Sequence, residues 1–169
     1  MNNLVNKVLK DDCLRALKKI DNNSIDMIYL DPPFFTQKTQ KLSNKNNDQY
    51  SFDDSWTSLD EYLDYIKDRL IECHRVLKDT GSIFVHLDKT ANHYIRVILD
   101  EVFGIKNFRN EIIWKYKRWS NSKSSLMNSH QNIYFYSKSS KYKFNKVYED
   151  YADTTNLDQI FQKRVRDDR

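Results

Sequence analysis

The sequence predicts a layered α/β domain with a largely parallel sheet, and three observations support that prediction. Two short apolar runs, 25–30 and 82–87, have the length and branched side chains of buried strands. Segments with apolar residues at helical spacing, 59–77 and 91–103, alternate with these runs. Such alternation is typical of sheets covered by helices. The 169 residues are enough for one domain with a sizeable core.

The first elements are expected to be short. Residues 5–9 have the pattern of a strand, and a helix is predicted from about Cys13 to Ile20, with Asp12 as its N-cap. The polar residues 22–24 then form a turn before the strand at 25–30.

Asp31-Pro32-Pro33-Phe34 follows that strand directly and contains both prolines of the chain. Proline fixes φ and donates no hydrogen bond, so the backbone leaves the sheet as a stiff, extended turn. The turn places the Asp31 carboxylate and the Pro32 carbonyl at the carboxyl end of a strand. In open α/β sheets this is where ligands bind.

The residue types in this turn suit chemistry on a nucleobase amine. Its lone pair is delocalised into the ring, and two acceptors that take its N–H bonds favour a pyramidal, more nucleophilic nitrogen. The carboxylate of Asp31 and the carbonyl of Pro32 are such acceptors, and Phe34 can stack on a base extruded from the duplex. The alternative is an ordinary Pro-Pro turn in which Asp31 is a solvated cap.

Residues 36–55 are polar and too long for a routine connection, so a mobile functional loop or lid is predicted, or else a disordered insertion. Ser58 and Glu61 have the spacing of a capping box. Gly81 is expected to end the helix that begins there, and Gly104 to end the next one.

Two further strands are expected, at about 108–116 and 132–136. His86 and Asp88 stand at the end of the strand 82–87, with His74 and His93 elsewhere in the chain. No spacing typical of metal ligands supports them, and no metal site is predicted.

The overall charge is mildly basic, with 28 Lys and Arg against 24 Asp and Glu. Ten of the basic residues fall between positions 106 and 146, interleaved with aromatic residues, which favours contacts with a nucleic acid. The alternative is a solvated strand face with buried rings on its reverse.

Two cysteines do not make a disulfide framework, and no signal peptide or membrane-spanning run is found. A reducing, cytoplasmic location is therefore expected, with no contact with a membrane.

Five segments, in this order, resemble the β class of bacterial DNA amino-methyltransferases, which methylate N6 of adenine or, less often, N4 of cytosine. They are Asp12-Cys13-Leu14, Asp31-Pro32-Pro33-Phe34, Gly81 to Asp88, Phe108 to Trp114 and His130 to Lys138. The resemblance implies a Rossmann-like methyltransferase sheet with flanking helices. Residues 1–117 would form its catalytic part, and 118–169 further strands and the start of a DNA-recognition region.

The resemblance also implies roles for individual residues. Asp31, Pro32, Pro33 and Phe34 would be catalytic, and Asp12 and Cys13 would line the adenine end of a pocket for S-adenosylmethionine. Basic residues of the second part would contact double-stranded DNA. These are Lys115, Lys117, Arg118, Lys123, Lys138, Lys141 and Lys143.

The chain departs from the family pattern in one respect. In this class the methionine end of the cofactor is held by a glycine-rich segment after the recognition region, and this sequence has only two glycines. It therefore resembles the first half of such an enzyme, incomplete in fold and inactive alone. A truncated product, a relic or one subunit of a split enzyme would each fit. Its expected partners are a second polypeptide with the glycine-rich loop, a restriction endonuclease, or further copies of itself.

Aspartate at position 31 favours adenine over cytosine. The sequence thus predicts part of a site-specific DNA adenine-N6 methyltransferase. Methylation of cytosine N4 and a non-catalytic DNA-binding fragment or pseudoenzyme are the alternatives, and an RNA methyltransferase is a weaker one.

Overall fold

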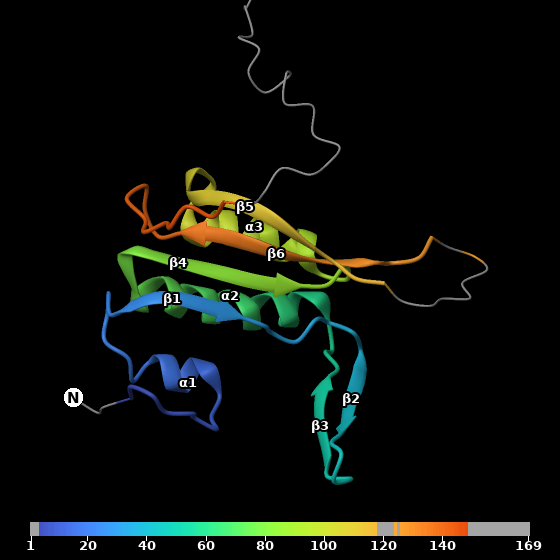
Figure 1. Cartoon of the computed structure of the whole chain (residues 1–169). Helices are drawn as coiled ribbons and strands as arrows, with labels where there is room; N and C mark the ends of the chain where they lie inside the picture. The colour runs from blue at the N-terminus through green and yellow to red at the C-terminus, as the bar shows by residue number, and fades with distance from the viewer. Residues whose placement is uncertain (1–3, 118–123, 125, 149–169) are drawn as a thin grey trace, which may run out of the picture.

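The computed structural model describes residues 4–117, 124 and 126–148 (Figure 1). The described strands form a four-stranded sheet and a two-stranded hairpin, and the helices α2 and α3 cover one face of the larger sheet (Figure 1). The elements in order are α1 (Cys13–Leu17), β1 (Ile25–Leu30), β2 (Lys38–Ser43), β3 (Gln49–Asp54), α2 (Leu59–Val76), β4 (Leu77–Leu87), α3 (Asn92–Phe103), a 3-10 turn (Ile105–Asn107), β5 (Phe108–Lys115) and β6 (His130–Ser137).

The larger sheet has the strand order β1-β4-β6-β5 and is mixed. β1 and β4 run parallel, whereas β6 lies between β4 and β5 and is antiparallel to both. The α/β class is confirmed, and three of the four strands, β1, β4 and β5, run in the same direction, with β6 as the exception. After α3 the chain does not place β5 directly beside β4. β6 then returns in the opposite direction and lies between them.

The hydrophobic core lies between the sheet and the two long helices. Ile28, Ile83 and Tyr136 are partners in register on β1, β4 and β6, and they face this core. Burial of such side chains is the main source of stability in a domain of this size. The fully buried members are Tyr62, Ile66, Leu70, Val76, Leu77, Ile83, Val85, Ile95, Leu99 and Tyr136.

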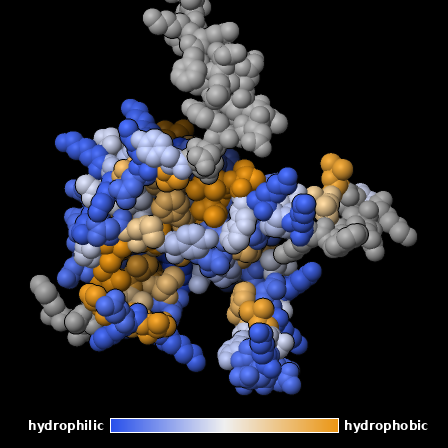
Figure 2. Space-filling model, viewed as in Figure 1, coloured by the Kyte–Doolittle hydropathy of each residue, from blue (hydrophilic) through white to orange (hydrophobic). Residues whose placement is uncertain are grey.

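The other face of the sheet is more open. Met27 and Tyr29 of β1 are 61% and 50% exposed, while Phe84 and Phe135 stack on one another at 4.5 Å between ring centroids. Figure 2 shows hydrophobic surface near β1 and near β6 on this side. The segment after β6 contributes Phe144, whose ring stacks on Phe135.

The first elements differ partly from the prediction. Residues 5–9 are not a strand, and Val8 is fully exposed, so this apolar run has no layer to pack against. α1 begins at the predicted residue, capped by Asp12, but it ends at Leu17. Arg75 of α2 donates to the carbonyls of Leu17 and Ile20, which ties the end of α1 to the helix layer.

Residues 36–55 form a hairpin, β2–β3, that extends away from the sheet (Figure 1). A disordered insertion was the wrong alternative, because the segment is a regular hairpin. A mobile functional lid stays a prediction. Asn44 organises the turn, because its side-chain oxygen accepts from the N–H groups of Asn46 and Asp48. Only one face carries apolar side chains, Leu42, Tyr50 and Phe52, and all three are exposed, so the hydrophobic alternation was too short to predict the strands.

α2 begins as predicted, since the hydroxyl of Ser58 accepts from the N–H of Glu61. The carboxylate of Glu61 also accepts from the N–H and the hydroxyl of Thr57. Gly81 does not end this helix. It lies inside β4, where an added Cβ would come within 3.0 Å of the Ile25 carbonyl and 2.9 Å of the Lys78 carbonyl.

The remaining elements follow the prediction. Gly104 ends α3 with φ of +85°, a conformation that glycine adopts without strain. β5 and β6 match the two expected strands within two residues at each end. In the part of the chain that the structure describes, no helix is long and apolar enough to span a bilayer.

Candidate active site

Asp31 lies immediately after β1, at the end of the sheet where β1 and β4 both finish. Leu30 pairs with Val85, so Asp31 comes beside His86 on the neighbouring strand. Its Oδ1 is 3.5 Å from the Nδ1 of His86. The Asp31 side chain is 59% exposed, and it can therefore meet a ligand from solvent.

His86 is buried and aromatic rings surround it. The ring of Trp114 stacks on it at 5.2 Å, and the ring of Phe34 meets it edge-on at 5.7 Å. Its Nε2 is 3.0 Å from the side-chain oxygen of Gln131. The imidazole is held by Gln131 and by the two rings, and its Nδ1 faces the Asp31 carboxylate.

The turn after Asp31 is held by Asp54, the last residue of β3. The Oδ2 of Asp54 accepts from the N–H groups of Phe34 and Thr36 and from the Thr36 hydroxyl. Its Oδ1 accepts from the N–H of Phe35 and from the indole of Trp56. Burial raises the pKa of Asp54, but the donors from Trp56 and Thr36 outweigh burial and keep the pKa below its usual range.

A second contact fixes the turn from the helix layer. The hydroxyl of Tyr62, on α2, donates to the carbonyl of Pro33 at 2.8 Å. Tyr62 is fully buried, and burial raises the pKa of its hydroxyl, so the phenol stays a donor. Phe35 and Trp56 pack against the Tyr62 ring with centroids 5.1 Å away in each case.

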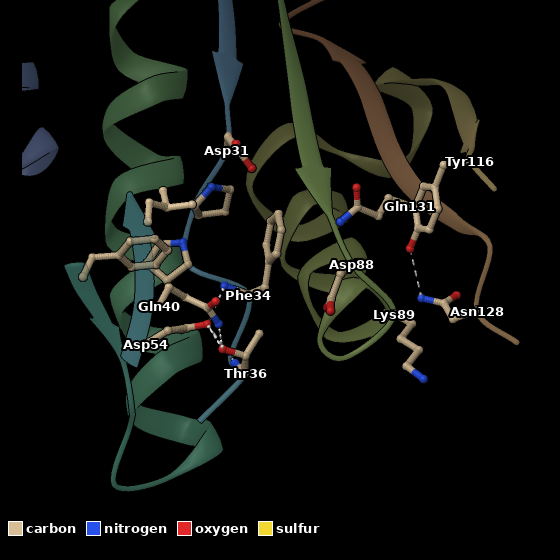
Figure 3. Close-up of a pocket in the computed structure, with 14 residues that line it drawn as sticks. Asp31, Phe34, Thr36, Gln40, Asp54, Asp88, Lys89, Tyr116, Asn128 and Gln131 are labelled. Carbon is tan, nitrogen blue, oxygen red and sulfur yellow. Dashed lines mark hydrogen bonds between the residues drawn. The ribbon is translucent and has the colours of Figure 1, made fainter. Parts of the chain in front are cut away.

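These side chains border a cleft of about 680 Å³ between the turn, the hairpin and the β4–α3 junction (Figure 3). Figure 3 shows the ring of Phe34 standing between the turn and the β4 side, with Asp88 and Lys89 opposite. The cleft contains acceptors, a cation and aromatic surface, which suits a flat polar ligand. Its lining comprises Asp31, Pro32, Pro33, Phe34, Thr36, Gln40, Leu42, Phe52, Asp54, Asp88, Lys89, Tyr116, Asn128 and Gln131.

The structure therefore brings together the four residues of the predicted catalytic turn. Reasoning from the sequence missed their supports, namely Asp54, Tyr62, Trp114 and Gln131. The sequence did contain one signal for Asp54. It lies in a short acidic pair flanked by the aromatic residues Phe52 and Trp56, a pattern that indicates packing of this part of the polar segment. In the described residues no group of three His, Cys, Asp or Glu side chains is arranged to hold a metal ion.

Asp12 and Cys13 do not line this cleft. Asp12 caps α1 through Oδ1, which accepts from the N–H groups of Leu14 and Arg15, and its Oδ2 is 2.6 Å from Nη2 of Arg69. The hydrogen bond from Arg69 lowers the pKa of Asp12. Both carboxylate oxygens are thus already engaged, one in capping α1 and the other in the contact with α2, and Cys13 is half-buried beside them.

Asp12→Asn should reduce stability at neutral pH by on the order of 1 kcal/mol or less. Asparagine keeps the capping acceptor and removes only the charge that pairs with Arg69. Since the pKa of Asp12 is depressed in the folded state, its contribution is present above the ordinary value of 3.8 and is lost as pH falls through the lower folded value. Urea unfolding should show that the variant is less stable than wild type at pH 7, and that this difference narrows as the pH falls below 3.8. If Asp12→Asn lowered stability equally in an Arg69→Met background, the effect would not come from the ion pair with Arg69.

The predicted DNA-binding lysines lie at two opposite ends of the sheet. Lys115 and Lys117 are exposed at the end of β5, near Tyr116 of the cleft. Lys138 lies at the far end, where its Nζ donates to the side chain of Asn23 and the carbonyl of Leu77.

Lys141 and Lys143 follow Lys138 at that far end, and the N–H of Lys143 donates to the carbonyl of Thr80. Arg118 and Lys123 lie outside the described residues. The single basic segment of the sequence is therefore two separate basic surfaces in the fold.

The protein is of the α/β class, and Asp31 and Phe34 border a cleft at the carboxyl end of β1. This is where open α/β sheets bind their ligands. The chain belongs to the DNA methylase family whose model, N6_N4_Mtase, matches residues 25–167. It is 37% identical over 157 residues to the type II methyltransferase M.HinfI of Haemophilus influenzae. It is 30% identical over 154 residues to the type II methyltransferase M.HpaI of Haemophilus parainfluenzae.

The alignments cover most of this chain, 88% and 91%, but only 43% and 42% of these two relatives. The chain thus spans less than half the length of the curated relatives it matches.

Solved structures agree on the fold. The PvuII cytosine-N4-specific DNA methyltransferase superposes with a TM-score of 0.55 at 18% identity, over 78% of this chain and 48% of that one. The M1.HpyAVI–SAM complex superposes with a TM-score of 0.53 at 15% identity, over 86% of this chain and 62% of that one. The mixed sheet with flanking helices is therefore a methyltransferase fold.

Proposed function

We propose that this chain carries the base-handling part of a DNA methyltransferase that uses S-adenosylmethionine and acts on N6 of adenine. The observation that supports it most is the exposed Asp31 carboxylate, which lies beside His86 at the cleft, in a chain of the DNA methylase family. Asp31 and the carbonyl of Pro32 accept the two N–H bonds of the target amine. The ring of Phe34 stacks on the base, which must leave the duplex to reach this cleft.

The described residues would account for part of the binding of the cofactor, namely its methyl-donor end and its adenine end. When bound, S-adenosylmethionine supplies an electrophilic methyl group on a positively charged sulfur, and Asp31 and Asp88 make this end of the cleft acidic. Asp12 and Cys13 are proposed for its adenine end, although Asp12 is already paired with Arg69. For the methionine end we propose a glycine-rich segment of a second polypeptide or of a longer chain.

One assay tests this function and distinguishes methylation of adenine N6 from methylation of cytosine N4. The chain is incubated with duplex DNA and labelled cofactor, alone and together with a polypeptide that carries the glycine-rich segment. Digestion to nucleosides then identifies the product as N6-methyladenine or N4-methylcytosine. Transfer only in the combined reaction, as N6-methyladenine, is expected. DNA binding without transfer in either reaction would favour the non-catalytic alternative.

The surface beside the cleft provides a prediction about DNA affinity. Replacing Lys115 and Lys117 together by alanine should weaken DNA binding for all sequences alike, since both are exposed at the catalytic end. Each lost phosphate contact should lower the slope of log affinity against log salt by about 0.9. Replacing Lys141 and Lys143, at the opposite end, is the matched control and should change the slope little. Equal effects of the two pairs would mean that DNA does not bind preferentially at the cleft.

The remaining partners are also proposals. Residues 118–169 are proposed to begin the DNA-recognition region. Relatives named as type II methyltransferases and as Mod subunits of type III restriction-modification enzymes support a companion endonuclease.

A further inference from the structure

Asp54 accepts five hydrogen bonds beside the cleft, and it touches no atom proposed to react. It is only 1% exposed, and three successive backbone N–H groups, of Phe34, Phe35 and Thr36, point at its carboxylate at 3.2, 3.1 and 2.8 Å. Consecutive N–H groups that converge in this way form an anion-binding concavity. Here a side chain of the same protein supplies the anion.

The backbone of this segment needs an external constraint. Phe35 and Gln37 have φ of +61° and +56°, in the left-handed region that residues with a Cβ disfavour. The N–H of Gln37 donates to the backbone carbonyl of Asp54, and the Gln37 side chain makes two hydrogen bonds with the backbone of Trp56. The segment after Phe34 is thus held along its length by the end of β3.

The conformation of this segment determines where the catalytic groups lie. The Phe34 ring is placed by a backbone N–H that Asp54 holds, and the carbonyl of Pro33 is fixed from the other side by Tyr62. With both contacts present, the ring of Phe34 and the Asp31 carboxylate border the same cleft. Without the anion, three partly buried N–H groups would lose their acceptor, and the left-handed residues could relax.

We propose that Asp54 is a positioning residue that holds the turn 34–36 so that Phe34 and Asp31 meet the target base in one orientation. This role rests on the proposed methyl transfer at Asp31. Aspartate is suited to it because both carboxylate oxygens only accept. Asparagine has the same shape but would direct an NH₂ group at one or more of the five donors.

The test compares Asp54→Asn with Asp53→Asn, its exposed neighbour, in the complete enzyme. Asp54→Asn should lower kcat about 10- to 100-fold, because misplacement by about 1 Å can cost 10²-fold, and should leave KM for DNA within a few fold. Asp53→Asn should leave both unchanged. Formate should restore part of kcat to Asp54→Ala, since it can enter the concavity as an anion, and should not restore Asp31→Ala.

Amide hydrogen exchange provides a readout that does not depend on catalysis. The amides of Phe34, Phe35 and Thr36 should lose protection in Asp54→Asn, while amides of β4 and α2 keep theirs. Thr36→Val, which removes one donor to Asp54, should do the same to a smaller extent if Asp54→Asn proves too unstable.

The outcomes separate the two proposals. Protection of these amides retained in both variants would overturn the positioning role, as would a normal kcat in Asp54→Asn. Wild-type protein without methyl transfer would instead overturn the proposed function, and the exchange data would still decide whether Asp54 holds the turn.

Discussion

Asp31→Ala is expected to abolish methyl transfer while the protein still folds and binds DNA. The carboxylate is 59% exposed, so its removal costs the core little. In the proposed mechanism it accepts an N–H of the target amine, and groups that act on a proton in the transition state contribute typically 10²–10⁴-fold. Tritium transfer from the cofactor should therefore fall by at least about 10²-fold, with gel-shift affinity unchanged.

Two further variants refine this result. Asp31→Asn keeps one acceptor oxygen beside His86 and should retain more activity than alanine. Asp88 lines the same cleft but caps its own turn, where Oδ1 accepts from the N–H of Thr90 at 2.7 Å. Asp88→Asn should consequently have a much smaller effect on transfer. Transfer at the wild-type rate in Asp31→Ala would remove Asp31 from the mechanism.

The part of the fold that the sequence predicted well depends on local signals. β1 and the two adjacent prolines specify their own conformation, because proline restricts its own φ and the residue before it. The start of α2 at Ser58 and the end of α3 at Gly104 are likewise decided by capping within a few residues.

The errors have a different origin. Gly81 was assigned to the end of a helix, but its lack of a side chain serves the close approach of β4 to the Ile25 carbonyl of β1. That approach joins residues more than 50 positions apart, and no local pattern reveals it. The direction of β6 has the same origin, since a strand inserted between two others is decided by the whole sheet.

The candidate site shows the same division between local and distant contacts. The turn carrying Asp31 and Phe34 was visible in four consecutive residues. Its supports are distant in sequence, because Asp54 lies 20 positions after Phe34 and Gln131 lies 45 positions after His86. Their residue types allow many roles, and only the fold selects one of them. For the basic residues the opposite holds. They lie in one segment of the sequence, but the fold places them at opposite ends of the sheet.

Phe34→Ala should reduce methyl transfer about ten- to a hundredfold, because stacking of a base on an aromatic ring is worth about 1–3 kcal/mol. The ring meets His86 edge-on and borders the cleft, so its exposed side is available to a base. Tyrosine or tryptophan at position 34 should be tolerated. A fluorescent base analogue at the target position would report the loss directly, as reduced unstacking on binding.

Phe35 is the matched control for this prediction, since it is adjacent but packs against the buried ring of Tyr62 at 5.1 Å. Phe35→Ala should lower the midpoint of urea unfolding, as expected when a ring is removed from a packed cluster. Phe34→Ala should leave that midpoint nearly unchanged and lose activity instead. If Phe34→Ala were as active as wild type but less stable, its ring would serve packing only. The extruded base would then have to be held by another ring of the cleft, of which Phe52 and Tyr116 are the candidates.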